Sequence, residues 1–76
     1  MEILEPNKKY SGTLSLQGIE VFATNSVVES ELRKAGFTDV IVTGNGKIRQ
    51  GTGVWKGEKQ PVPAKYASKF TNIKEV

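Results

Sequence analysis

Basic and aromatic side chains gather in the C-terminal half of the sequence. Residues 1–43 carry four basic and six acidic side chains, a net charge of −2, whereas residues 44–76 carry seven basic and two acidic ones, a net charge of +5. Cations can contact the phosphates of a single-stranded nucleic acid while aromatic rings stack on its bases, and basic surfaces also bind acidic proteins. The candidate partner or nucleic-acid surface comprises Lys47, Arg49, Trp55, Lys56, Lys65, Tyr66 and Lys69.

Several of these residues share one side of an expected strand. Side chains two apart along a strand point the same way, so Arg49 and Trp55 lie on one face with Lys47, Gly51 and Gly53. That face combines two cations, two glycines and an indole. We expect it to accept either a nucleic-acid backbone or a protein strand at close range.

Plainer interpretations of the same residues remain open. Lysines commonly coat a solvent-exposed face without binding any partner. The only tryptophan of so small a chain is typically a core residue, and Trp55 is then buried under the C-terminal segment by Tyr66 or Phe70. No sequence signature of a known DNA- or RNA-binding fold adds support for nucleic-acid binding.

The sequence lacks the side chains on which most catalysis and metal binding depend. Histidine and cysteine are absent, and Asp39 is the only aspartate, so the commonest general base and the commonest metal ligands are missing. A Walker A loop is excluded because it needs Ser or Thr after Gly46-Lys47, where the chain has Ile48. The dinucleotide-binding fingerprint is excluded because it needs a glycine three residues after Gly51-Thr52-Gly53, where the chain has Lys56. We therefore expect no autonomous enzyme, no cofactor and no metal. A composite active site shared with a partner chain stays open as an alternative.

An alternating pattern predicts a hairpin near the N-terminus. Even-numbered positions from Tyr10 to Leu16 are apolar or glycine and alternate with serine and threonine, a period of two that indicates a strand. A turn at Gln17-Gly18 would return the chain through residues 19–24 as a second strand. In that strand Phe22 is the one apolar side chain on a polar face, so it is a candidate packing contact for a neighbour or a partner.

A helix is predicted from Ser26 to the residue before Gly36. Ser26 and Glu29 match a capping box, in which the hydroxyl and the carboxylate each satisfy a free main-chain N–H at the start of the helix. Gly36 is typical of a helix end because glycine adopts positive φ without strain. Apolar residues spaced three and four apart from Val28 to Ala35 form the stripe that should face a sheet.

A second hairpin should follow the helix. Residues 37–42 end in three consecutive β-branched side chains, which predicts a central strand buried on both faces. Asn45-Gly46 is a strong turn signal and leads into a strand over residues 47–55. The register is less regular than in the first hairpin, so a longer loop or a bulge at Gly51 or Gly53 is open.

The C-terminal residues read as an arm on the main unit. We expect residues 1–60 to form a ββαββ domain and residues 61–76 to form an extended or short-helical arm that packs on it or on another chain. Phe70 in this arm is the second candidate packing contact. The element order predicts an α+β fold in which a small antiparallel sheet is backed by one helix.

Chain length and composition limit what the domain achieves alone. At 76 residues, a domain buries only about 60% of its unfolded surface, so the core is marginal and a partner surface would add stability. No apolar run is long enough for a membrane span, and Glu2 and Glu5 stand where a signal peptide carries basic residues. We expect a soluble protein, intracellular or within a particle.

The preferred hypothesis from the sequence is a non-enzymatic protein-interaction or assembly protein. A protein partner or self-assembly into an oligomer fits the marginal core and the missing catalytic residues. A small structural component of a virus or phage particle has this profile. The alternative is a small basic nucleic-acid-binding protein that uses the C-terminal half, and neither interpretation involves a membrane or a metal.

Overall fold

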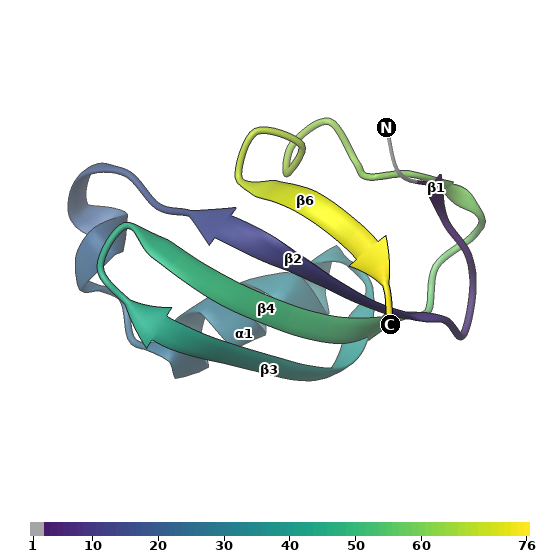
Figure 1. Cartoon of the computed structure of the whole chain (residues 1–76), viewed down its shortest axis with the longest axis horizontal. Helices are drawn as coiled ribbons and strands as arrows, with labels where there is room; N and C mark the ends of the chain where they lie inside the picture. Colours follow the sequence, from purple (N-terminus) through teal and green to yellow (C-terminus); the bar gives the residue numbers. More distant parts are fainter. Residues whose placement is uncertain (1–2) are drawn as a thin grey trace.

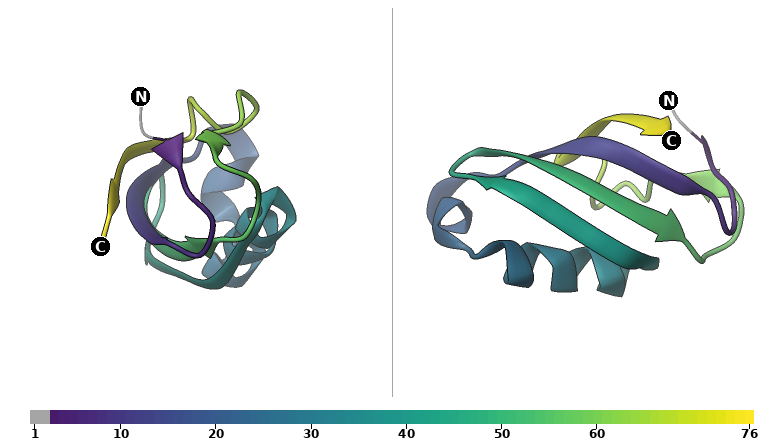
Figure 2. Two further views of the ribbon diagram at one scale, coloured as in Figure 1. Left: turned by 90° about the vertical axis from the view of Figure 1, so that its right-hand side faces the viewer. Right: turned by 60° about the horizontal axis from the view of Figure 1, so that its bottom comes forward.

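The computed structural model describes residues 3–76 and has an α+β fold (Figure 1). A four-stranded antiparallel sheet has the strand order β3-β4-β2-β6, and a second sheet pairs β1 with β5. The helix α1 lies against one face of the curved larger sheet, chiefly over β3 (Figure 2). The predicted class, a small antiparallel sheet with one helix, is confirmed. The elements are β1 (Ile3–Leu4), β2 (Lys9–Ser15), the 3-10 helix η1 (Gly18–Phe22), α1 (Asn25–Ala35), β3 (Phe37–Asn45), β4 (Ile48–Trp55), β5 (Gln60–Pro61) and β6 (Phe70–Glu75).

β2 confirms the first predicted strand, but the predicted return strand over residues 19–24 is wrong. Positions 10, 12, 14 and 16 are all buried, as the alternation requires. After Gly18, whose φ is 60°, the chain forms η1 instead of a strand. β2 pairs with β4 along one edge and with β6 along the other, so it has no free edge for a hairpin partner.

The N-cap of α1 lies two residues before Ser26, where the capping box predicted it. The N-cap is Thr24, whose hydroxyl accepts a hydrogen bond of 3.3 Å from the Val27 N–H. The Glu29 carboxylate does not cap the helix; it accepts a hydrogen bond of 2.9 Å from the Val42 N–H in β3. The Glu29 carboxylate, which the capping box requires, is therefore hydrogen-bonded to the sheet instead.

The end of α1 and its apolar stripe are as predicted. Gly36 follows the last helical residue with a φ of 124°, and its N–H bonds to carbonyl oxygens of the last turn. Val28 and Leu32 are buried, and Ala35 packs at the border of the core. Within residues 3–76 no helix is long and apolar enough to span a membrane.

β3 is an edge strand, so the prediction of a central strand buried on both faces is wrong. It pairs with β4 alone. Val40 and Val42 are buried, whereas Ile41 points to the uncovered face of the sheet and is 58% exposed. Side chains of α1 bond the outer edge of β3 at two points: the Asn25 side chain donates a hydrogen bond of 3.0 Å to the Gly44 carbonyl, and the Glu29 carboxylate accepts one from the Val42 N–H. Helix side chains thus take the place of a further strand.

The second hairpin forms, but its turn and its bulge lie elsewhere than expected. Asn45 pairs with Ile48, so the two-residue turn is Gly46-Lys47, one residue later than predicted. Gly46 supplies the positive φ, 72°, that such turns require at their first position. The register shifts on β3 beside Asp39, whose φ is 51°, and not at the glycines of β4.

The C-terminal segment differs in part from the predicted arm. Residues 64–69 form successive turns, and β6 then joins the main sheet beside β2. Phe70 is buried in the core of its own chain. Glycine at position 12 makes this possible, since a Cβ atom there would lie 2.6 Å from the Phe70 ring.

Three aromatic side chains organise the core. Phe37 packs edge-on against Trp55 with ring centroids 5.0 Å apart, and against Phe70 with centroids 5.9 Å apart. The indole N–H of Trp55 donates a hydrogen bond of 2.7 Å to the Glu58 carbonyl, so its polar atom is satisfied on burial. Strands β3, β4 and β6 are joined through this cluster.

We predict that Gly36→Ala destabilises the fold more than Gly18→Ala. Gly18, with φ 60°, lies in the left-handed region that other residues can enter, and nothing lies within 4 Å of a Cβ atom there. Gly36, with φ 124°, lies outside that region, and a Cβ atom there would meet the Trp55 ring at 2.9 Å. Backbone strain and crowding against the core together should lower the free energy of unfolding by about 1–2 kcal/mol beyond the loss in the control. Urea denaturation measures both, and equal losses would show that Trp55 does not restrict this site.

Candidate functional site

The structure places two of the expected surface residues in the interior. Arg49 is 3% exposed and Trp55 is 2% exposed. Arg49, Gly51, Gly53 and Trp55 share one face of β4, as strand parity predicted, but this face points into the core. Lys47, which was expected on the same face, lies in the turn before β4 and is exposed. The cation and the indole that the nucleic-acid hypothesis needed on that strand are therefore not available on the surface of the monomer.

The Arg49 side chain forms hydrogen bonds with three segments of the chain. Its Nε donates to the Gly46 carbonyl at 3.3 Å, its Nη1 to Asn25 Oδ1 at 3.0 Å and its Nη2 to the Val21 carbonyl at 3.0 Å. These acceptors belong to the hairpin turn, the start of α1 and η1. No carboxylate among residues 3–76 forms an ion pair with Arg49, so neutral oxygens alone stabilise its charge.

The remaining candidate cations lie in three separate places. Lys47 and Lys56 are exposed but flank opposite ends of β4, about 30 Å apart along the extended chain. Lys56 donates a hydrogen bond of 2.9 Å to Asn7 Oδ1. Lys65 and Lys69 lie with Tyr66 on the turns of residues 64–69, beside α1. The structure brings together only this last group.

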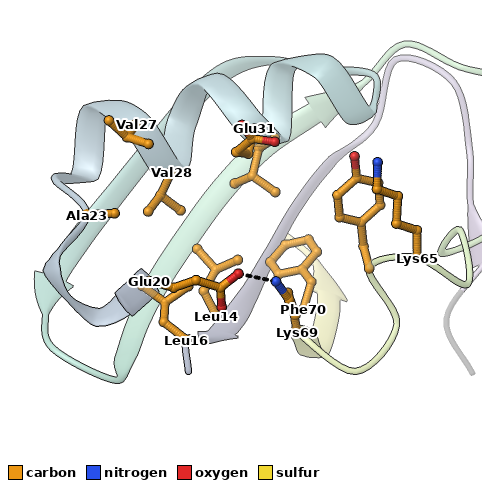
Figure 3. A pocket seen from close by; sticks show the side chains of 12 residues that line it. Leu14, Leu16, Glu20, Ala23, Val27, Val28, Glu31, Lys65, Lys69 and Phe70 are labelled. Atoms are coloured by element: carbon orange, nitrogen blue, oxygen red, sulfur yellow. Dashed lines mark hydrogen bonds and ion pairs between the residues drawn. The ribbon is translucent and has the colours of Figure 1, made fainter. Parts of the chain in front are cut away.

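A groove of about 340 Å³ opens between α1, η1 and the turns of residues 64–69 (Figure 3). Its floor comes from β2, β6 and α1 and is apolar. Two acidic side chains stand on the η1 and α1 side, and two lysines stand on the opposite side. The lining residues are Leu14, Leu16, Glu20, Ala23, Val27, Val28, Glu31, Leu32, Lys65, Tyr66, Lys69 and Phe70.

One ion pair bridges the two sides of the groove. Glu20 of η1 pairs with Lys69, and the same carboxylate accepts a hydrogen bond of 3.1 Å from the Gln17 N–H. The bond from Lys69, and then the bond from Gln17, hold the pKa of Glu20 below its ordinary value. Further along, the Lys65 ammonium lies 5.7 Å from the centre of the Tyr66 ring. The polar groups of the groove thus sit at its rim, above an apolar floor.

η1 displays two large apolar side chains next to the groove. Side chains three apart eclipse on a 3-10 helix, so Ile19 and Phe22 stand together, and they are 87% and 83% exposed. The next side of the turn carries Glu20 towards the groove, and Val21 packs against the core. We call Ile19 and Phe22 the knob. Phe22 was singled out from the sequence, and its exposure leaves it available to a partner.

Sequence reasoning missed Ile19 and the groove. The pattern over residues 19–24 predicts a strand, whereas the chain forms η1 there and exposes Ile19. The signal against that interpretation was Phe22 itself, because a large apolar side chain broke the polar face that the strand required. The groove had no local signal, since its walls come from η1, α1 and residues 64–69.

The groove offers apolar burial and charge at its rim and no metal-binding cluster. Among residues 3–76, no three acidic side chains come together in a way that could hold a metal ion. Its two carboxylates, Glu20 and Glu31, each pair with a lysine of the same chain. The arrangement is suited to receiving apolar side chains that carry opposite charges at their margins.

We predict that Arg49→Met lowers the free energy of unfolding by about 2–4 kcal/mol. The substitution removes three charge-assisted hydrogen bonds and leaves three partly buried acceptors without this partner, although it also relieves the cost of burying a charge. Lys47→Met, on the exposed tip of the same hairpin, should change stability by less than about 0.5 kcal/mol. Urea denaturation of both variants decides the matter; an Arg49→Met variant as stable as the wild type would contradict the fastening role.

A second prediction concerns the pH dependence of the Glu20–Lys69 pair. Because folding lowers the pKa of Glu20, the carboxylate stabilises the folded state above its ordinary pKa of 4.5, and that contribution disappears as the pH falls through the lowered value. Wild type should exceed Glu20→Gln in stability at pH 7 and lose this advantage on acidification below about pH 4.5. High salt should also weaken it. Thermal unfolding from pH 7 to pH 2 provides the comparison, and an advantage that persists at pH 2 would contradict the prediction.

Comparison with known proteins gives no family for this chain: no protein-family model, no curated protein and no solved structure matches it. The knob, the groove and the charges at its rim are therefore the observations from which a function must be inferred.

Proposed function

We propose that this protein is a non-enzymatic interaction or assembly protein that docks on a protein partner through the knob and the groove. The observation that carries the proposal is the display of Ile19 and Phe22, almost fully exposed, beside an apolar recess. Contiguous exposed apolar surface next to charged residues is a common mark of protein interaction sites. Aromatic side chains at such sites often supply much of the binding energy.

The knob is held in a fixed position, which favours binding. The Val21 carbonyl is bonded to Arg49, and Glu20 is bonded to Lys69 and to the Gln17 N–H. η1 therefore has contacts on two sides that hold its backbone while its apolar side chains face solvent. A surface that is ordered before binding loses less conformational entropy on association.

The edges of the sheet are less suited to docking than the knob. The outer edge of β3 is bonded to Asn25 and Glu29 of α1. β6 is short, is irregular at Asn72, where φ is 53°, and carries Lys74. Short, irregular and charged edges discourage the addition of another strand. Of the two packing contacts expected from the sequence, Phe70 is buried in its own chain and Phe22 is exposed, so we assign the docking to Phe22.

The proposed docking contributes to a larger assembly. A small domain with a marginal core gains stability by burying the knob against a partner. A virus or phage particle is the kind of assembly anticipated from the sequence, and a structural role there needs no catalytic residues.

We predict that a photo-crosslinking amino acid at position 22 captures one protein partner of defined mass in an extract of the cells that make this protein. The same probe at Thr43, which is exposed on the uncovered face of the sheet, should not capture it. Excess unlabelled wild type should compete the adduct away, whereas excess Phe22→Ser should compete poorly because it lacks the aromatic anchor. Equal labelling from positions 22 and 43, or an adduct that neither competitor removes, would contradict docking through the knob.

A further inference from the structure

We infer that the uncovered face of the four-stranded sheet binds the phosphate backbone of a double-stranded nucleic acid. This face is the side of β3, β4, β2 and β6 that is turned away from α1 and the core (Figure 2). It is separate from the knob and the groove, so the inference goes beyond the docking proposed above and does not depend on it.

The strand register places a row of neutral polar side chains across this face. Thr13 in β2 lies opposite both Gln50 in β4 and Thr71 in β6, and Gln50 lies opposite Thr43 in β3. Residues directly opposite each other in antiparallel strands share a face, and Thr43 is exposed, so all four point outward. Gln50 also donates a hydrogen bond of 3.4 Å to the Thr13 hydroxyl. The row spans about 14 Å and offers three hydroxyls and an amide to a ligand.

A second row adds positive charge. Ser11 in β2 lies opposite Thr52 in β4 and Lys74 in β6, and Thr52 lies opposite Ile41 in β3. Lys9, two residues before Ser11 on the same strand, points to the same face and is exposed. Lys9 and Lys74 are therefore diagonal neighbours, with Cβ atoms about 7–8 Å apart. Neither lysine forms an ion pair with a carboxylate of residues 3–76.

The acidic side chains of the sheet lie away from these two lysines. β2 and β4 contain no acidic residue. Glu75 of β6 lies opposite Tyr10, whose side chain is in the core, and it pairs with Lys8 at 3.7 Å. Asp39 stands on β3, at the far edge of the sheet, where the register shifts. The corner of the face around Lys9 and Lys74 is thus positive, which is complementary to a polyanion.

The side chains of the two rows favour a nucleic acid over an acidic protein. Lysine, serine, threonine and glutamine are residue types that contact phosphates in protein–DNA complexes, and such interfaces are more polar and more positive than those between proteins. Neither row contains an aromatic side chain on which the bases of a single strand could stack. A duplex keeps its bases inside and presents phosphates, so the expected contact is independent of base sequence.

The test is the binding of a fluorescein-labelled DNA duplex of mixed sequence, followed by fluorescence anisotropy over a series of salt concentrations. Wild type should bind at low salt, and the logarithm of its association constant should fall against the logarithm of salt concentration with a slope of about −2, for two phosphate contacts. Lys9→Gln with Lys74→Gln should weaken binding about 10-fold or more at low salt and remove most of the slope. A wild type that does not bind the duplex at low salt would overturn the inference.

A second pair of lysines provides the matched control. Lys34 and Lys65 are exposed on the α1 side of the sheet, and Lys34→Gln with Lys65→Gln changes the net charge by the same amount. This double variant should bind within about 3-fold of wild type, since salt screens charges that are remote from the contact. Equal losses in the two double variants would show that net charge, and not this face, governs binding, which would overturn the inference. Circular dichroism establishes that each variant is folded.

A hydroxyl variant tests the rows themselves. Thr52→Val with Thr71→Val removes two hydroxyls of the face but keeps β-branched side chains that suit strands. Binding of the duplex should weaken about 3- to 10-fold, the size of a net hydrogen bond between neutral groups, with the salt slope unchanged. Unaltered affinity in this variant would exclude the rows from the contact.

Two further ligands distinguish the occupants. A single-stranded oligonucleotide of the same length should bind more weakly than the duplex, and tighter binding of the single strand would overturn the assignment to a duplex. Polyglutamate should compete poorly, whereas competition as strong as that of unlabelled duplex would assign the face to an acidic protein instead.

The outcomes separate this inference from the proposed function. Phe22→Ser should bind the duplex as wild type does, because the knob lies outside the uncovered face. The variant with Lys9→Gln and Lys74→Gln should still compete for the partner captured from position 22. Loss of duplex binding in Phe22→Ser would contradict the uncovered face as the site, and failure of the capture experiment alone would leave duplex binding intact.

Discussion

The hydrogen bonds of the buried Arg49 guanidinium are the constraint on which the rest of the structure depends. A buried charge without a carboxylate partner is costly, and neutral oxygens must compensate for the water that it has lost. Those oxygens come from Gly46, Asn25 and Val21, which belong to a hairpin turn, a helix start and a 3-10 helix. One side chain therefore connects its own hairpin to η1 and to the start of α1, whose acceptors lie 28 and 24 residues earlier in the sequence, and any shift of one segment would leave part of the charge unsatisfied.

The hydrogen bond from Arg49 to Val21 fixes the position of η1, and η1 in turn places the knob and one side of the groove. Because Arg49 holds the Val21 carbonyl, Val21 turns to the core while Ile19 and Phe22 remain in water. The pair between Glu20 and Lys69 then ties η1 to the turns of residues 64–69. The groove thus has polar contacts at its rim and an apolar floor.

The outer edge of β3 and the knob differ in what they could gain from a partner. Asn25 and Glu29 bond the outer edge of β3, so its main chain has little to gain from another strand. The apolar side chains of the knob are still exposed to water, so burying them against a partner is favourable. The docking proposed above therefore uses side chains rather than strand addition.

Local pattern in the sequence determined the alternating strand β2, the apolar stripe of α1, its end at Gly36 and a hairpin at Gly46, because each depends on neighbouring residues alone. The absence of histidine and cysteine likewise limited the chemistry from composition. Only the tertiary structure decided that Arg49 and Trp55 face inward, that η1 replaces a strand, and that β6 enters the sheet. Strand parity identifies which side chains share a face, but the direction of that face depends on where α1 packs. Likewise, residues 19–24 could not pair as a strand once β4 and β6 had occupied both edges of β2, and that competition between distant segments has no trace in local sequence.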